Sequence, residues 1–322
     1  MYDVVVFGSC MIDFISYVNR MPKFGETIHS ESFEVGYGGK GSNQAIASAR
    51  LGCKTAMIGK IGNDGYGKNY KRHFEEEGIN TEYLETAGEY SGIALIVVNS
   101  ADGDNQIVIN GNANKFLSVE DCVKARSVFD QSKILICQLE TPIEATIEAM
   151  KSFQGLSILN AAPAVSNLPE IAFRLPSIFC VNELEAEEFT NVKFIEISDV
   201  KKIIQSLIHE KGCKTVIVTL GKNGAAFNDN DEIYHVPIQK EVQVVDSTGA
   251  GDAFIGALAF FFSKFPDASL VQKVAASIVI ATSSVQNKGT QSSYINFPAI
   301  DPTKEQFKCN INNHFIVGKK PN

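Results

Sequence analysis

The sequence lacks the features that define several large classes of protein. No apolar run is long enough to span a bilayer, and residues 4–7 form a strand-like segment near the N-terminus without a signal-peptide pattern. Lysine and arginine number 29 against 37 aspartates and glutamates, and the resulting net charge of −8 argues against binding to nucleic acid. We therefore expect a cytoplasmic protein, with the nucleus as an alternative location, that binds neither nucleic acid nor a membrane.

Disulfide and zinc patterns are absent as well. The seven cysteines include no Cys-x-x-Cys pair and are scattered through apolar segments such as residues 134–137, which is typical of reduced thiols in a core. The five histidines are dispersed and form no zinc-binding pattern. The chain also contains no internal repeat and no low-complexity linker.

Apolar strand-like runs alternate with amphipathic helical runs along most of the chain. This alternation is typical of a parallel sheet covered by helices on both faces. With 322 residues and 44% hydrophobic content, the chain can form one large α/β domain or a large and a small one. Strands are expected at residues 3–7, 55–59, 134–137, 157–160, 178–181, 216–220, 225–228 and 242–245. Helices are expected between them, for example at residues 66–77, 143–152 and 200–209.

Two intervals interrupt this rhythm, at residues 28–35 and 92–110. In the second, apolar runs at residues 94–98 and 107–109 flank the sequence Ala-Asp-Gly-Asp, which indicates a β-hairpin. After about residue 301 the periodicity is lost, and we expect a peripheral tail there.

A turn of small residues joins the expected strand at residues 242–245 to an apolar helix at residues 253–262. The first N–H groups of a helix have no intrahelical partner and carry partial positive charge, so this turn favours an anion. Asp252 beside that anion could accept a proton from a hydroxyl that attacks a phosphate. It could equally be a helix N-cap. The turn by itself leaves these two interpretations about even.

A second glycine cluster, at residues 36–45, also leads into a helical pattern, at residues 45–51. Gly41 stands where a Walker P-loop needs a serine or threonine after Lys40, so that motif is excluded. A sugar suits the cluster better, because Asn43 can both donate and accept hydrogen bonds; an ordinary loop is the alternative. The first strand is not followed by Gly-x-Gly-x-x-Gly, which argues against a dinucleotide-dependent oxidoreductase.

These two motifs, in this order and at this separation, resemble the two signatures of the ribokinase (pfkB) family of carbohydrate kinases, and most closely its eukaryotic members. The resemblance covers residues 3–297, and further matching segments are residues 8–13, 25–27, 137–142, 182–187, 219–224 and 289–293. It implies a single α/β domain over residues 1–322 with a three-layer αβα, Rossmann-like architecture. Residues 14–38 and 92–112 would form a small β-sheet lid, which also serves as a homodimer contact.

The activity implied by the resemblance is phosphorylation of D-ribose at O5 by ATP. Asp252 would be the general base, and the backbone of Gly249, Ala250 and Gly251 would stabilise the transferred phosphoryl group. Sugar contacts are implied at Met11, Asp13, Gly39, Lys40, Gly41, Asn43 and Glu140. Met11 departs from the bacterial members, which carry asparagine there, and Asp13 is expected in a loop after the first strand. Nucleotide contacts are implied at Asn182, Thr219, Gly221, Gly224, Gly251 and Ser277.

Two metal ions are implied as cofactors. Mg²⁺ would be bound through water by Glu185, one helical turn after Asn182, since this ion keeps much of its hydration. Without the resemblance, residues 183–188 are an acidic helix start, and Glu183 is expected on the solvated surface. K⁺ would activate the enzyme from a site formed by Asp246, Thr248, Ser284, Asn287, Gly289 and Ser293. A kinase for fructose or adenosine, or a non-catalytic sugar-binding regulator, remain alternative functions.

Overall fold

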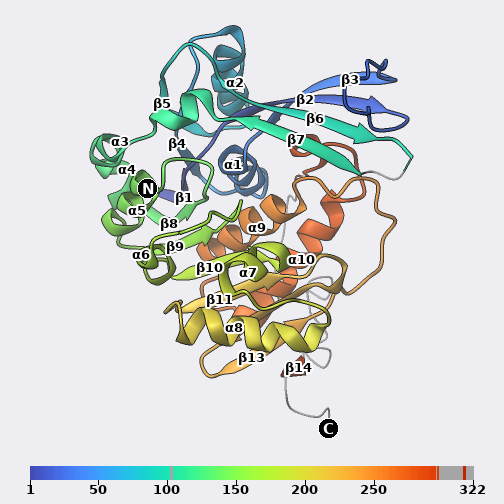
Figure 1. Ribbon diagram of the computed structural model, residues 1–322. Coiled ribbons are helices and arrows are strands. Elements are labelled where there is room, and N and C mark those ends of the chain that lie inside the picture. Colours follow the sequence, from blue (N-terminus) through green and yellow to red (C-terminus); the bar gives the residue numbers. More distant parts are fainter. Residues whose placement is uncertain (102–103, 295, 297–314, 317–322) are drawn as a thin grey trace.

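The computed structural model describes residues 1–101, 104–294, 296 and 315–316, and it contains two sheets (Figure 1). The larger sheet has ten strands in the order β14-β13-β12-β11-β10-β9-β8-β1-β4-β5. Its parallel part consists of β5 (Asn80–Thr86), β4 (Thr55–Ile61), β1 (Tyr2–Phe7), β8 (Ser132–Cys137), β9 (Leu156–Asn160), β10 (Ile178–Asn182) and β11 (Thr215–Thr219).

One edge of this sheet departs from the expected all-parallel arrangement. The strands β12 (Ala225–Asp229), β13 (Glu232–Val236) and β14 (Phe315–Ile316) are antiparallel to their neighbours. The connection between β12 and β13 is a tight turn in which Asn230 has a positive φ of 53°, and so short a turn can join only antiparallel strands. The rest of the tail predicted after residue 301 lies outside the described residues.

Alternate residues of the central strands belong to two different hydrophobic clusters, as expected for a sheet buried on both faces. In β1, Val4 and Val6 pack into one cluster, and Val5 and Phe7 pack into the other. The first cluster is completed by α1 (Lys40–Arg50), α2 (Gly65–Glu76), α9 (Ala250–Lys264) and α10 (Leu270–Ser284). The second is completed by α3 (Val119–Lys124), α4 (Arg126–Asp130), α5 (Ile143–Ser152), α6 (Glu170–Arg174), α7 (Glu183–Thr190) and α8 (Val200–His209). The three-layer α/β prediction is confirmed.

The smaller sheet, which we call the lid sheet, projects from one end of this core (Figure 1). Its strands are β3 (Ser32–Gly38), β2 (Met11–Val18), β6 (Gly92–Asn99) and β7 (Asn105–Asn110), in that order. The prediction that Asp13 lies in a loop is wrong, because β2 begins at Met11 and pairs with β3 and β6 through Asp13. The chain enters the second sheet almost directly after β1, since β1 ends at Phe7 and β2 begins at Met11.

The strand expected at residues 242–245 is also absent. This segment is irregular, and the side chains of Val244 and Val245 are 62% and 50% exposed. The N–H groups of Val245 and Asp246 bond to the carbonyl of Val285 at the end of α10, so the segment is tied to a helix and not to the sheet. Val242 and Val244 line a large cavity, which explains apolar residues outside any sheet.

Candidate active site

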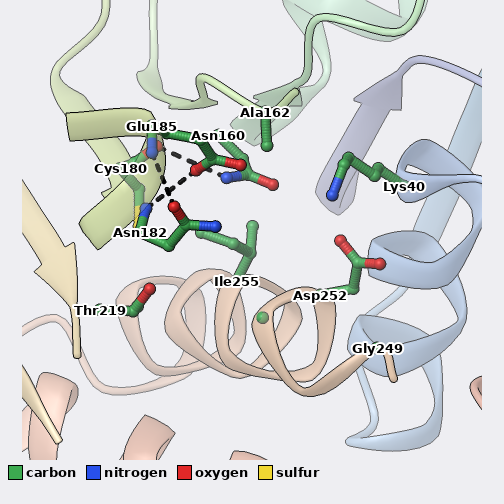
Figure 2. Close-up of a pocket in the computed structure, with 11 residues that line it drawn as sticks. Lys40, Asn160, Ala162, Cys180, Asn182, Glu185, Thr219, Gly249, Asp252 and Ile255 are labelled. Carbon is green, nitrogen blue, oxygen red and sulfur yellow. Dashed lines mark hydrogen bonds between the residues drawn. The ribbon is translucent and has the colours of Figure 1, made fainter. Parts of the chain in front are cut away.

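Two adjoining cavities lie at the carboxyl ends of the parallel strands, where open α/β sheets bind ligands. The smaller encloses about 180 Å³ between α1, α9 and the ends of β9, β10 and β11 (Figure 2). The larger encloses about 720 Å³ and extends along α10 and the segment that precedes α9. Asn182, Thr219 and Gly251 line both cavities, so a ligand in one can reach a ligand in the other.

The N-terminus of α9 faces both cavities. Its N-cap, Gly249, has a φ of 77°, and an added Cβ there would lie 2.4 Å from Thr290 Cγ2, so only glycine fits. The N–H groups of Gly251 and Asp252 have no acceptor among the described residues, whereas the N–H of Ala250 bonds to Ser247 O at 3.3 Å. The free N–H groups and the helix dipole together favour an anion at this point.

Asp252 lies in the first turn of α9, lines the smaller cavity and is 6% exposed. Its side chain accepts hydrogen bonds from two consecutive residues of α1. Asn43 Nδ2 donates to Oδ2 at 2.9 Å, and Gln44 Nε2 donates to Oδ1 at 2.8 Å. The carboxylate is therefore fixed by side chains, and it does not cap its own helix, since α9 has no side-chain cap.

Lys40 extends from the start of α1 into the smaller cavity, opposite Asp252 (Figure 2). Burial by itself would lower the pKa of Lys40, but the nearby carboxylates of Asp252, Glu140 and Glu185 outweigh it and raise that pKa. The ammonium group forms no salt bridge within 4.0 Å to the part of the chain that the structure describes. A largely buried cation of this kind suits a bound anion.

Two carboxyl groups lie beside Lys40 on the side of the lid sheet. Glu140 Oε2 accepts from Ser9 Oγ at 2.5 Å and from the N–H of Lys40 at 2.8 Å, and burial raises the Glu140 pKa. Asp13 in β2 has no hydrogen-bond partner among the described residues, and a Cβ on Gly38 would lie 2.2 Å from its Oδ2. Burial, assisted by the charges of Glu140 and Asp252, raises the pKa of Asp13 to about 7.

The remaining residues implied as sugar contacts surround these groups. Gly39 is the N-cap of α1, with a φ of 92°, and Gly41 follows Lys40 in its first turn. Lys40 is the member of this set that lines the smaller cavity, and the others line neither cavity. Met11 is 2% exposed. The structure thus gathers the polar members of the set around Lys40 and presents Met11 as a buried apolar residue.

Asn182 and Glu185 form a reciprocal capping box at the start of α7, and both line the smaller cavity. The N–H of Asn182 donates to Glu185 Oε2, and the N–H of Glu185 donates to Asn182 Oδ1, both at 2.8 Å. Burial raises the pKa of Glu185. Its second carboxylate oxygen accepts no hydrogen bond from the described residues and can bind a water or an ion (Figure 2 shows Glu185 in the cavity wall).

The larger cavity collects the residues implied as nucleotide contacts. Five of them line it: Asn182, Thr219, Gly221, Gly224 and Gly251. Ser277 is fully buried and donates to Lys273 O at 2.7 Å, while its neighbour Ile278 lines the cavity. Glu183 was expected on the solvated surface, but it is half-buried and lines the same cavity, and burial raises its pKa.

The residues implied as K⁺ ligands meet where the segment before α9 contacts the loop after α10. Asp246 Oδ1 accepts from the N–H of Thr248, and Oδ2 accepts from the N–H of Gly289, both at 2.9 Å. Nearby backbone carbonyls are bonded within the loop: Ser284 Oγ donates to Ala281 O, Asn287 N to Ser284 O and Ser293 Oγ to Thr290 O.

Residue-type reasoning missed two glutamines of the site, Gln44 and Gln291. Gln291 Nε2 donates to Asn43 Oδ1 at 2.9 Å and to Tyr70 Oη at 3.1 Å. Neither glutamine carries a charge or belongs to a reactive class, so only position relative to the glycine clusters could have drawn attention to them.

Other site types find no support in the described ranges. These contain no group of three His, Cys, Asp or Glu side chains that could hold a metal ion. Their helices include none long and apolar enough to cross a membrane. The six cysteines that the structure describes are buried and free, which agrees with the prediction of reduced core thiols.

Comparison with known proteins gives the following matches. The model of the pfkB family carbohydrate kinases matches residues 1–296. A Mus musculus protein named ribokinase is 44% identical over 297 residues, which cover 90% of this chain and 91% of that protein. A Salmonella typhi protein named deoxyribokinase is 39% identical over 312 residues, which cover 96% of this chain and 99% of that protein. The solved structure of Arabidopsis thaliana ribokinase complexed with ribose and ATP matches with a TM-score of 0.81 and 28% identity, covering 91% of this chain and 95% of that chain.

Proposed function

This chain belongs to the pfkB family of carbohydrate kinases, and from that membership we propose that it transfers the γ-phosphoryl group of ATP to O5 of D-ribose. The products are ribose 5-phosphate and ADP. The observation that carries the proposal is the position of Asp252: a buried carboxylate in the first turn of α9, beside free N–H groups and opposite Lys40. The likeness to mouse ribokinase, at 44% identity, supports ribose as the sugar.

Asp252 accepts the proton of the attacking O5 hydroxyl. A base must lie within hydrogen-bond reach of the proton that it removes, and Asp252 is a carboxylate that lines the smaller cavity. Asp13 and Glu140 hold sugar hydroxyls on the side of the lid sheet, with Asn43 and the backbone of Gly39 and Gly41 completing the contacts. Such a site orients O5 towards the phosphoryl group, and orientation supplies much of the rate.

Negative charge that develops on the transferred phosphoryl group is stabilised by fixed groups. The N–H groups of Gly251 and Asp252 at the start of α9 donate to it, and the Lys40 ammonium pairs with it. These groups are in place before the reaction and need no reorganisation, which is the main source of catalysis in phosphoryl transfer. The nucleotide lies in the larger cavity against Thr219, Gly221 and Gly224.

Mg²⁺ bound together with ATP would neutralise phosphate charge. This ion prefers a few protein oxygens, several waters and bridging phosphates, and the acidic groups here fit that preference because Glu185 offers a single carboxylate oxygen towards the cavity. Asn182 positions Glu185 through the capping box, so it acts on the ion through its neighbour.

The junction of residues 246–248 and 284–293 would hold the activating K⁺. Asp246 bridges these two segments through the N–H groups of Thr248 and Gly289. An ion bound to the oxygens around this bridge would order the turn that contains Gly249, whose carbonyl accepts from Tyr294 Oη at 3.0 Å. Its effect on the reaction would be structural, since it would act through the N-terminus of α9.

The protein assembles as a homodimer through the lid sheet and resides in the cytoplasm. Strand register places Val35, Phe14, Leu95 and Val108 in one row across the face of the lid sheet opposite to Asp13. Of this row Val35, Leu95 and Val108 are exposed, and the exposed Phe33 lies on that same face. These four exposed apolar side chains have exposed fractions of 49–66%, and burying them against a second copy of the chain is favourable.

The buried reduced cysteines fit a reducing compartment such as the cytoplasm.

Deoxyribose is the second candidate substrate. A protein named deoxyribokinase is 39% identical over 96% of this chain. Met11, buried in the lid sheet where bacterial members carry asparagine, offers no amide to a sugar hydroxyl. A site with one polar group fewer discriminates less against a sugar that lacks one hydroxyl.

ADP formation by the purified protein tests the proposal. The reactions contain ATP and Mg²⁺ with ribose, 2-deoxyribose, fructose, adenosine or no sugar, each with and without K⁺. We expect ribose-dependent turnover that K⁺ increases. Turnover with fructose or adenosine but not with ribose would show that the proposed substrate is wrong, and it would remain consistent with Asp252 as the base. Ribose binding without turnover would favour a sugar-binding regulator.

A further inference from the structure

Gln44 occupies a position between the catalytic carboxylate and the core, out of reach of any substrate. It is 0% exposed and lines neither cavity. Its Nε2 donates to Asp252 Oδ1 at 2.8 Å and to Asn160 Oδ1 at 3.0 Å, and its Oε1 accepts from Gln138 Nε2 at 2.7 Å. All the hydrogen-bonding atoms of its amide are therefore engaged with protein groups, one of which is Asp252.

The carboxylate of Asp252 determines the orientation of both glutamine amides. A carboxylate only accepts hydrogen bonds, so the Nε2 of Gln44 must point to it and the Oε1 must point to Gln138. Gln138 must then donate with Nε2, which leaves its Oε1 buried without a partner, the one such side-chain atom among the described residues. Leaving a buried oxygen without a protein partner is unfavourable, and such an atom in a native protein calls for an explanation, such as a role in a functional site or a bound water.

The two oxygens of Asp252 are held from different directions. Gln44 holds Oδ1, while Asn43 holds Oδ2 and is itself oriented by Gln291. Two donors to the two oxygens stop rotation of the carboxylate about its Cβ–Cγ bond. The lone pairs that remain can then face the cavity in a single orientation, which a general base requires.

We propose that Gln44 is a positioning residue for Asp252, oriented for this task by Gln138; this inference rests on the proposed kinase function. Gln44 acts on the rate of the chemical step and on no binding step, because it cannot touch the sugar or the nucleotide. A residue that merely packed α1 against α9 would affect stability and leave the rate of each folded molecule unchanged.

The variant Gln44→Met tests this distinction, because it keeps the length of the side chain and removes both donors. With saturating ATP and the preferred sugar, we expect kcat to fall about 10- to 100-fold, as for loss of a hydrogen bond to a charged group, with both KM values within about threefold of wild type. The control is Ser48→Ala, one turn later on α1, whose hydroxyl bonds only to the carbonyls of Gln44 and Gly256. That variant should keep the wild-type kcat.

A kcat for Gln44→Met equal to that of Ser48→Ala, or a loss confined to KM, would overturn the proposal. If Gln44→Met does not fold, Gln138→Leu decides the matter. It deletes the unpaired Gln138 Oε1 and leaves Gln44 Oε1 without its donor, so the number of unpaired oxygens does not rise. We expect a folded protein with kcat reduced about threefold or more, and a wild-type kcat would refute the inference. An inactive wild type in the same assay would instead refute the proposed function itself.

Discussion

Replacing Asp252 with asparagine removes the proposed base and keeps the size of the side chain. Because Asn43 and Gln44 both point N–H groups at Asp252, an asparagine can accept from one of them only, and its own NH₂ group then faces the other donor. An unpaired buried donor costs about 1–3 kcal/mol of unfolding free energy. The substitution also removes a charge that raises the pKa of Asp13, and this relief offsets part of the cost.

The effect on the rate should be much larger than the effect on stability. A positioned general base contributes about 10²- to 10⁴-fold to a rate, which corresponds to about 3–5 kcal/mol of activation free energy. Asp13 and Glu140, the proposed sugar contacts, form no hydrogen bond with Asp252 and should stay in place. We therefore expect Asp252→Asn to reduce kcat by at least about 10²-fold and to bind ribose with nearly wild-type affinity.

The assay measures ADP release at saturating substrates, and calorimetry measures ribose binding to the same preparations. Glu188→Gln is a matched control, since it removes an exposed carboxylate from α7 without touching either cavity. An unchanged kcat for Asp252→Asn would refute the assignment of Asp252 as base. Loss of ribose binding with an unchanged kcat would indicate that Asp252 binds the substrate and is not the base.

Three further predictions follow from other parts of the site. The pKa of Asp13 is raised to about 7, so its contribution to stability is fully present below about pH 4 and is lost as pH rises through about 7. Thermal midpoints should show this loss, and Asp13→Asn should reduce it. Because sugar hydroxyls donate to the ionised form, the Kd for ribose should fall about tenfold between about pH 6 and about pH 8, and a flat profile would contradict the contact. Asp246→Ala should abolish the increase in kcat on replacing choline chloride by KCl, because it removes the bridge between Thr248 and Gly289; persistent stimulation would place the K⁺ site elsewhere. Val108→Lys in the lid sheet should give a monomer in sedimentation experiments, whereas Val123→Lys at the exposed surface of α3 should not, and a dimer in both variants would exclude this face.

The sequence alone determined the layered architecture and predicted where along the chain the proposed catalytic residues lie. Helices α5 and α8 begin and end where the apolar periodicity predicts. A 3.6-residue repeat of apolar residues indicates a helix, and the polar residues at either side mark its ends. The turn before Asp252 was recognisable because it needs small residues, and its role depended on likeness to a known family, since capping and catalysis use the same residue type.

Predictions from the local sequence pattern were wrong for residues whose environment is formed by distant parts of the chain. Val242 and Val244 line a cavity, and a short valine-rich run of this kind cannot be distinguished from a buried strand by its pattern. Asp13 was assigned to a loop because a second sheet directly after β1 leaves no local signal of its own.

Only the tertiary structure decided how the carboxylate of the proposed base is held. Asp252 and Gln44 are 208 positions apart, and they meet because α1 and α9 pack on the same face of the sheet. The amide of a glutamine is a common surface group, and nothing in its chemistry marks it until burial forces each of its atoms to find a partner. The sequence thus names the reacting groups, whereas the packing of distant helices sets the geometry in which they can react.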